Sequence, residues 1–444
     1  METIIKRAEK FSQSITVKAI IIGFLTLILL IPGSMIQNLI QEREQRSNET
    51  IEKINSKWSN AQTITGPVLS VPYVYSYSDE KNVTKTERHI LNITPEVLDM
   101  NAKVLPEERH IGIYKSILYK SELQISGKFG KIDTQKLTYS SILWNEATIR
   151  IGITDLRGVT NNIDFVLDGL HFNAEAGGSR QDAIGQGLVI TPNHAELFIA
   201  DKELSFNCTL HLNGSSNLNF IPMGKTTKVE MNGAWQAPGF TGSFSPTHSM
   251  TEKGFKANWH ILHFNRSIPE NWIDNQVDNF NDTKFGVDLV DTVDHYQQNM
   301  RSAKYALMFI ALTFVVFFFV EVLTKKKIHP IQYLLVGIAL ILFYSLLLSI
   351  SEQLNFGLAY LIASVATIGL ISLYAHSIFK NRTQTGMLAT ILSVLYIFLY
   401  VVLQLEDVAL LFGSIGLFII LGIIMYFSKR INWYKQDETE DDQK

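Results

Sequence analysis

Cysteine and an excess of either charge are what this sequence lacks. Only Cys208 is a cysteine among 444 residues, which excludes an internal disulfide and any metal site built from several cysteines. Lysine and arginine number 39 against 42 aspartates and glutamates, giving a net charge of −3. No strongly basic surface for nucleic acid is therefore expected. The length is sufficient for two domains.

Motifs for catalysis and cofactor binding are also lacking. The stretch 224–226, Gly-Lys-Thr, resembles the end of a phosphate-binding loop, but Asn219 stands where that motif needs its first glycine. Asp274, Asp278 and Asp282 lack the glycine and the final glutamate of a calcium-binding loop. Neither G-x-S-x-G nor H-E-x-x-H occurs in the sequence. We therefore predict no enzymatic activity, no cofactor and no metal site.

Long uncharged apolar runs are what the sequence has instead. A helix crosses a bilayer when about 20 consecutive residues are mostly apolar. The first such run is Ala19–Ile36, which follows four basic residues between positions 6 and 18. A cleaved signal peptide is the alternative, but residues 31–34, Ile-Pro-Gly-Ser, form a poor cleavage site. An uncleaved transmembrane helix over residues 19–40 is predicted.

Five further apolar runs follow within residues 302–428. The gaps between them hold only a few residues, so the helices are predicted to form an antiparallel, up-and-down bundle. Ala359, Ala363 and Thr367 recur every four residues, and Gly413 and Gly416 lie in the last run; such small residues let transmembrane helices approach closely. The runs are 305–323, 333–350, 356–379, 387–403 and 408–427.

The short loops predict the orientation, because lysine and arginine prefer the cytoplasmic side. Three loops or ends on one side of the bundle carry Lys325–Lys327, Lys380 with Arg382, and residues 429–430. The two loops on the other side have acidic residues and neither lysine nor arginine. The basic loops are therefore predicted to face the cytoplasm.

Both termini then lie in the cytoplasm: residues 1–18 before the first helix and an acidic tail over residues 429–444. Residues 41–301 form one large segment outside the cytoplasm. Arg301 and Lys304, on the outer flank of the second helix, do not fit this orientation. They carry less weight than the short loops, because long translocated domains cross the membrane largely regardless of charge.

The outer segment is predicted to be mainly β, after a helical start in which Ile51, Ile54 and Trp58 share one face. Short β-branched and aromatic stretches alternate with polar residues and are separated by glycine, asparagine, aspartate and proline. A β-sandwich or a partly open barrel is expected. The predicted strands are 68–77, 88–93, 111–118, 122–129, 148–154, 204–212, 228–234 and 255–263.

Glu321 is the main charged residue within the predicted spans. It lies one turn from the cytoplasmic end of its helix, where it can reach Lys325 four residues later. An ion pair at the membrane interface is the favoured interpretation, and a proton-transfer site is the alternative. His329 and Pro330 are predicted to start the next helix, because proline is tolerated in a first helical turn.

Irregular polar motifs flank these spans, and they carry a resemblance to a known family. The chain resembles the CreD family of inner-membrane proteins over nearly its whole length. Gln353 departs from the histidine expected after Ser351-Glu352, which argues against a titrating histidine there. The strongest matches are 294–297, 301–307 (with Arg301 and Lys304), 311–314, 321–324, 329–337 (His329 to Tyr333 and beyond) and 351–352 (with Glu352); weaker ones are 66–67, 109–114, 155–158 and 254–255.

This resemblance implies a stress-induced protein of the bacterial inner membrane that maintains the cell envelope, and it supplies no catalytic residues. The expected function is non-enzymatic: the β domain binds an envelope lipid, a glycan or a protein partner, while the helices contact the lipid bilayer. A transporter or channel for a small solute or lipid is the alternative. Discontinuous helices and buried polar groups would favour that alternative.

Overall fold

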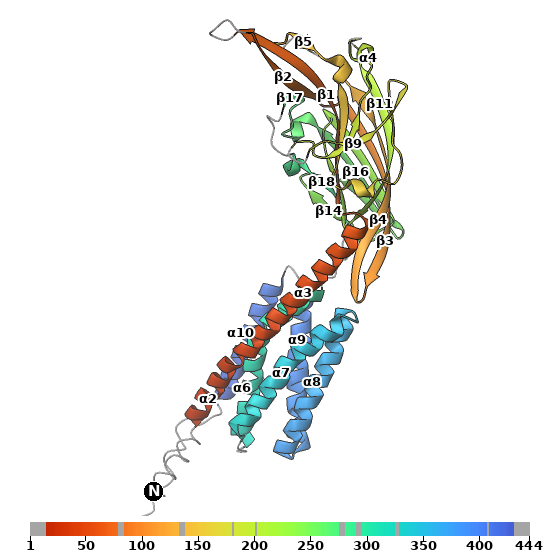
Figure 1. The fold of residues 1–444 in the computed structure, drawn as a ribbon. Helices are drawn as coiled ribbons and strands as arrows, with labels where there is room; N and C mark the ends of the chain where they lie inside the picture. The colour runs from red at the N-terminus through yellow and green to blue at the C-terminus, as the bar shows by residue number, and fades with distance from the viewer. Residues whose placement is uncertain are drawn as a thin grey trace, which may run out of the picture. The chain divides into compact units, whose positions relative to one another are not determined.

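The computed structural model divides the chain into two compact units. The helical unit comprises Met1–Ser47 and Val293–Lys444, and the β unit comprises Asn48–Thr292. Figure 1 shows both units with their elements labelled. The residues described are 15–78, 84–132, 138–179, 182–199, 202–274, 280–289, 295–324, 328–405 and 408–429.

The first helix is interrupted once, between α2 (Ile15–Ile28) and α3 (Leu30–Trp58). Pro32 has no N–H to bond to the carbonyl four residues earlier and its ring crowds that carbonyl, so the ladder breaks near residue 28. Val17–Trp58 nevertheless forms one helix of 42 residues, about 63 Å long and therefore about twice the hydrocarbon thickness of a bilayer. Its apolar first half is long enough to span the membrane.

Six more helices belong to the part of the helical unit that the structure describes. Three of them, α7, α8 and α9, are long and apolar enough to span a membrane, as is the first helix. Helices α5 and α6 meet at a 46° bend and reach the spanning length only if the two are taken together as one span. The apolar part of α10, Leu411–Tyr426, is shorter than the other spans. The count of six spans therefore stays a prediction. The bounds are α5 (His295–Lys304), α6 (Ala306–Thr324), α7 (Pro330–Ser351), α8 (Phe356–Phe379), α9 (Arg382–Gln404) and α10 (Ala409–Ser428).

Small residues pack the bundle as the sequence predicted, with one exception. Ala359, Ala363 and Thr367 on α8 are all buried, and α8 packs between α7 and α9. A Cβ atom on Gly416 would lie 2.3 Å from the Phe398 ring, so that glycine admits a close contact between α10 and α9. Gly413 has no neighbour within 4 Å of such an atom and plays no packing role.

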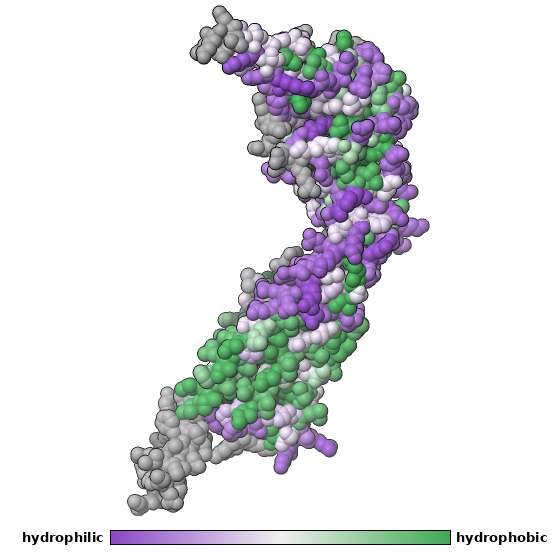
Figure 2. Space-filling model, in the orientation of Figure 1, coloured by the Kyte–Doolittle hydropathy of each residue, from purple (hydrophilic) through white to green (hydrophobic). Residues whose placement is uncertain are grey.

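The outer surface of the bundle is apolar. Large hydrophobic side chains point away from the packed core on every long helix, for example Phe24 on α2, Leu373 on α8 and Phe418 on α10, which are 62%, 75% and 78% exposed. In Figure 2 the helical unit is mostly green for this reason, whereas the visible surface of the β unit is mainly purple and white. Such a continuous apolar surface needs lipid around it.

The β unit is built from two sheets. The ten-stranded sheet has the order β14-β18-β12-β1-β6-β10-β9, with β2 and β5 also paired to β1 and β17 paired to β2. Its strands are β1 (Gln62–Ser78), β2 (Thr84–Ile93), β5 (Ser141–Ile142), β6 (Thr148–Ile153), β9 (Glu175–Gly177), β10 (Gly187–Ile190), β12 (Asn217–Ile221), β14 (Gly239–Gly242), β17 (Asn271–Ile273) and β18 (Phe285–Asp288).

The eight-stranded sheet has the order β15-β16-β13-β3-β4-β11-β7-β8. A short helix, α4 (Ala195–Ile199), precedes β11 in the chain. The strands of this sheet are β3 (Val97–Ile111), β4 (Tyr114–Phe129), β7 (Asp164–Leu167), β8 (Leu170–Asn173), β11 (Leu204–Ser215), β13 (Thr226–Gly233), β15 (Thr247–Thr251) and β16 (Gly254–Leu262).

One hydrophobic core joins the two sheets, so the β unit is a sandwich. Inward-facing residues of both sheets, such as Val68 on β1 and Met100 on β3, belong to the same buried cluster. Along β16 buried and exposed residues alternate from Phe255 to Leu262, which is the two-residue period of a sheet with one covered face. The mainly β character predicted from the sequence is confirmed.

Several strand boundaries differ from the prediction: β1 and β2 begin earlier than predicted, and β3 and β4 differ most. Residues 111–118 were predicted as one strand, but Gly112 adopts a φ of +62° in a turn between β3 and β4. The strand β4 then runs without interruption through residues 114–129, so it contains most of the predicted strand 111–118 and all of the predicted strand 122–129. The whole of β3 before Ile111 was missed, since Pro106 and the charged residues after it resemble a loop.

Candidate functional site

Glu321 is the buried polar centre of the helical unit. It is 4% exposed, and its Oε1 accepts hydrogen bonds from the Lys18 ammonium on α2 and from the backbone N–H of Ile328 at 3.1 Å. Its Oε2 accepts a hydrogen bond of 2.8 Å from the Tyr333 hydroxyl on α7. Three separate parts of the chain therefore meet at one carboxylate, which needs these partners because an unpaired buried charge is costly.

Glu321 has a partner, Lys18, that the sequence did not suggest. The predicted pair with Lys325 lies outside the described residues, and Lys18 was treated only as part of the basic flank of the first helix. Tyr333 was a candidate only through the family motif. It meets Glu321 because His329 starts α7: its Nδ1 accepts from the Ile331 N–H at 3.3 Å, and Pro330 occupies the first turn.

A second polar cluster lies at the other end of α7. The Tyr296 hydroxyl on α5 donates to Glu352 Oε1 at 3.3 Å, and the Asn299 amide donates to the Ser351 hydroxyl at 2.7 Å. Asn299 and Ser351 are 1% and 3% exposed. These contacts fasten α5 to the end of α7, so the sequence candidate Glu352 has a positioning role. Arg301 and Lys304 lie on α5 just before its bend.

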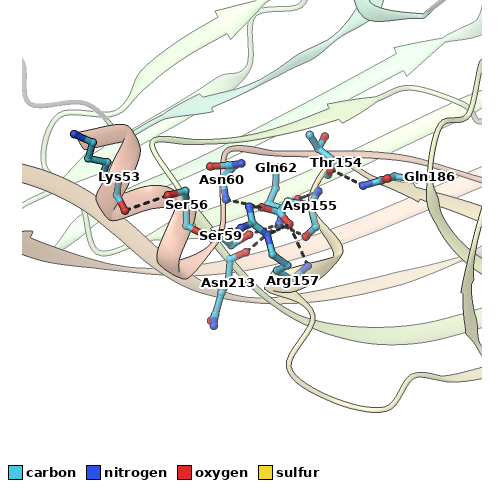
Figure 3. A network of polar contacts seen from close by, with 10 residues as sticks. All are labelled: Lys53, Ser56, Ser59, Asn60, Gln62, Thr154, Asp155, Arg157, Gln186 and Asn213. Atoms are coloured by element: carbon cyan, nitrogen blue, oxygen red, sulfur yellow. Dashed lines mark hydrogen bonds and ion pairs between the residues drawn. The ribbon is translucent and has the colours of Figure 1, made fainter. Parts of the chain in front are cut away.

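The strongest polar network of the β unit lies where α3 ends (Figure 3). The Arg157 guanidinium donates to Asp155 Oδ1 at 2.9 Å and Oδ2 at 2.6 Å, and also to the Ser56 carbonyl in the last turn of α3 at 2.7 Å. Asp155 accepts a further bond of 3.0 Å from the Asn60 N–H. The Gln62 amide group donates to the carbonyl of Asp155 at 2.8 Å.

This network of hydrogen bonds holds the end of α3 against the sandwich. The arginine satisfies a carbonyl that the helix end leaves unpaired and complements the negative end of the helix dipole. The Arg157 guanidinium, with two backbone N–H donors, lowers the pKa of Asp155 from 3.8 to about 2. At Gly158 a Cβ atom would lie 2.3 Å from the Asn213 carbonyl oxygen, so only glycine fits there. Asp155, Arg157 and Gly158 are also matches of the family motif.

Polar side chains also cover the outer face of the eight-stranded sheet, where they line a hollow of about 740 Å³ that we call the polar groove. Its floor is formed by Met100, Val229 and Trp259, whose side chains are buried in the core. No hydrophobic motif marks the groove in the sequence, because each of its residues is simply the polar member of an alternating strand. Its polar side chains come from Asp99, Asn101, Gln124, Ser126, Lys228, Glu230, Thr247, Asn258 and His260 on the strands and from Ser245 just before β15.

Within the described ranges no three histidine, cysteine, aspartate or glutamate side chains gather where they could hold a metal ion. What the structure offers is polar binding surface on the β unit and polar fastening points in the helical unit. Several helices long and apolar enough to cross a membrane, together with the large β sandwich, define a multi-pass membrane protein with a globular β domain.

Comparison with known proteins gives the family. Residues 14–434 match the family described as "Inner membrane protein CreD". The chain is also 30% identical over 415 residues to the inner membrane protein CreD of Escherichia coli (strain K12), covering 92% of this chain and 91% of that protein. The chain belongs to the CreD family, and it is a multi-pass protein of the inner membrane.

Proposed function

We propose that this protein maintains the integrity of the cell envelope under stress, without catalysing a reaction, through ligand binding by its β domain. The helical unit anchors the chain in the bilayer, and the β domain faces outward, with both chain termini in the cytoplasm. The positions of lysine and arginine in the short loops support that orientation.

The polar groove is the observation that carries this proposal. Surface strands usually carry scattered polar residues, but here nine polar side chains from five adjacent strands border one hollow. A concave polar surface of this size suits a ligand that is recognised by hydrogen bonds. An envelope component or a partner protein outside the membrane is the class of ligand that an outward-facing domain meets.

A deletion strain complemented with parts of the chain tests this function. The full chain should restore resistance to detergents and wall-active agents, whereas residues 293–444 alone, or the β domain on an unrelated membrane anchor, should restore less. All proteins are compared at equal membrane abundance by immunoblotting. If the helices without the β domain restored full resistance, ligand binding by that domain would not be the function.

Transport of a small solute or lipid is the second candidate. The bend of 46° between α5 and α6, in a span that also holds the buried Glu321, favours it, because broken helices and intramembrane carboxylates are common in transporters. Purified protein in liposomes distinguishes the two functions. A proton or solute flux that Glu321→Gln abolishes, with resistance lost in parallel, would favour transport over ligand binding.

A further inference from the structure

The polar groove consists of two parallel rows of side chains. In one row, Lys228 is in register with both His260 and Asp99, and Asp99 is in register with Ser126. The second row lies two residues further along the same strands and runs from Thr247 through Asn258, Glu230 and Asn101 to Gln124. Neighbouring strands are about 4.8 Å apart, so a row across five strands extends over about 19 Å.

The charges of the groove cancel. Asp99 and Lys228 are neighbours in the register, and Glu230 is paired with Lys256 of the adjacent strand at 2.6 Å. The groove itself holds two acids and one lysine, and Lys256 beside it balances the second acid; this leaves no net charge to attract a polyphosphate or an anionic lipid headgroup. The remaining side chains are amides, hydroxyls and one imidazole.

Amides and hydroxyls both donate and accept hydrogen bonds, as do the hydroxyl groups of a sugar. A peptide, in contrast, binds a sheet mainly through an unpaired strand edge or through apolar pockets for its side chains. Thr247 belongs to the edge strand β15, but the other groove residues on strands lie on the face of paired strands, and the apolar lining residues are 2% or 3% exposed. Asp99 Oδ1 is buried and has no hydrogen-bond partner among the described residues, so one acceptor beside the groove is left unsatisfied.

We propose that the polar groove binds a neutral, linear oligosaccharide, with its sugar hydroxyls bonded to the two rows of amide and hydroxyl side chains. This ligand class rests on the proposed function, because it specifies which envelope component the β domain recognises. Asn101 and Asn258 are the central contacts, since they flank Glu230 in the same row.

Binding of cellotetraose and chitotetraose to the full-length protein tests this proposal. The protein is reconstituted in lipid nanodiscs, because maltoside detergents would supply a competing sugar. Saturation-transfer difference NMR should show saturable binding of at least one tetrasaccharide and none of tetraalanine. The Asn101→Ala, Asn258→Ala double variant should bind about tenfold more weakly, since each lost hydrogen bond weakens binding by roughly two- to tenfold.

Asn173→Ala is the matched control, because Asn173 is an exposed asparagine of the same sheet on β8, which β7 and β11 separate from the groove strands. It should bind like the unaltered chain. If neither tetrasaccharide bound, or if the double variant bound as tightly as the control, the oligosaccharide proposal would be wrong. If tetrasaccharides failed to bind and the double variant still lost envelope resistance, the proposed function would stand with a different ligand. Full resistance in a double variant that no longer binds sugar would instead refute the proposed function.

Discussion

Replacing Asp155 by asparagine should destabilise the β domain by about 2 kcal/mol. The carboxylate accepts two bonds from the Arg157 side chain and two from backbone N–H groups. One pKa unit corresponds to about 1.4 kcal/mol, so a pKa lowered from 3.8 to about 2 corresponds to about 2 kcal/mol of folding free energy. Asparagine keeps one acceptor oxygen and turns an N–H₂ group toward donors.

The single cysteine supplies the assay. Cys208 is 4% exposed on β11, and burial raises the pKa of its thiol to about 12, so a thiol-reactive fluorophore labels it only after the domain opens. Thermal labelling of the full chain should show the midpoint for Asp155→Asn lowered by about 4–8 °C. Glu203→Gln is the control, because its pair with Lys128 is more than half exposed on both sides and should contribute under about 1 kcal/mol.

The pH dependence gives a further check on the same carboxylate. A lowered pKa in the folded state means that the contribution of Asp155 is fully present above pH 3.8 and is lost as the pH falls toward about 2. The difference in midpoint between Asp155→Asn and the unaltered chain should therefore be constant from pH 7 to about 5 and shrink below pH 4. Equal midpoints for Asp155→Asn and Glu203→Gln at pH 7 would refute the reasoning.

Three other outcomes follow from the structure. Glu321→Gln and Lys18→Met should each lower stability by about 1–3 kcal/mol, since each leaves a hydrogen-bonding partner unsatisfied, and in a double-mutant cycle in nanodiscs the double variant should lose less than the sum of the two losses; additive losses would show that the ion pair is unimportant. Gly158→Ala should lower the thermal midpoint by the equivalent of about 1–3 kcal/mol, since its Cβ would overlap a backbone carbonyl; an unchanged midpoint would contradict that packing. In a cysteine-free background, an impermeant maleimide should label Lys103→Cys in intact cells but not Arg382→Cys, and the reverse pattern would overturn the predicted orientation.

The helices were predictable because their signal is local. A run such as residues 333–350 is apolar throughout, and His329 with Pro330 marks the helix start that the structure has. Strands with strict alternation, such as β11 and β16, were also predictable. The hairpin of β3 and β4 was not, because Pro106 and the charged residues after it resemble a loop, whereas the turn at Gly112 lies within a strand-like stretch.

The polar sites could not be predicted as sites. Lys18 and Glu321 are 303 residues apart, and nothing in the sequence distinguishes Lys18 from the other basic residues near the N-terminus. Arg157 and Ser56 are likewise far apart in the sequence, by 101 residues, so their contact could not be predicted from it. The polar groove depends on the register of five strands, and a shift of one residue in any of them would turn its side chains into the core.

Envelope resistance of a strain that carries the groove variant tests the central claim most directly. The deletion strain receives the full chain, the Asn101→Ala, Asn258→Ala variant or the Asn173→Ala control, each at equal membrane abundance. Survival is then measured against a detergent and a wall-active antibiotic. Ligand binding by the β domain predicts that the groove variant survives no better than the deletion strain, while the control survives like the full chain. Survival of the groove variant at the level of the full chain would contradict that account.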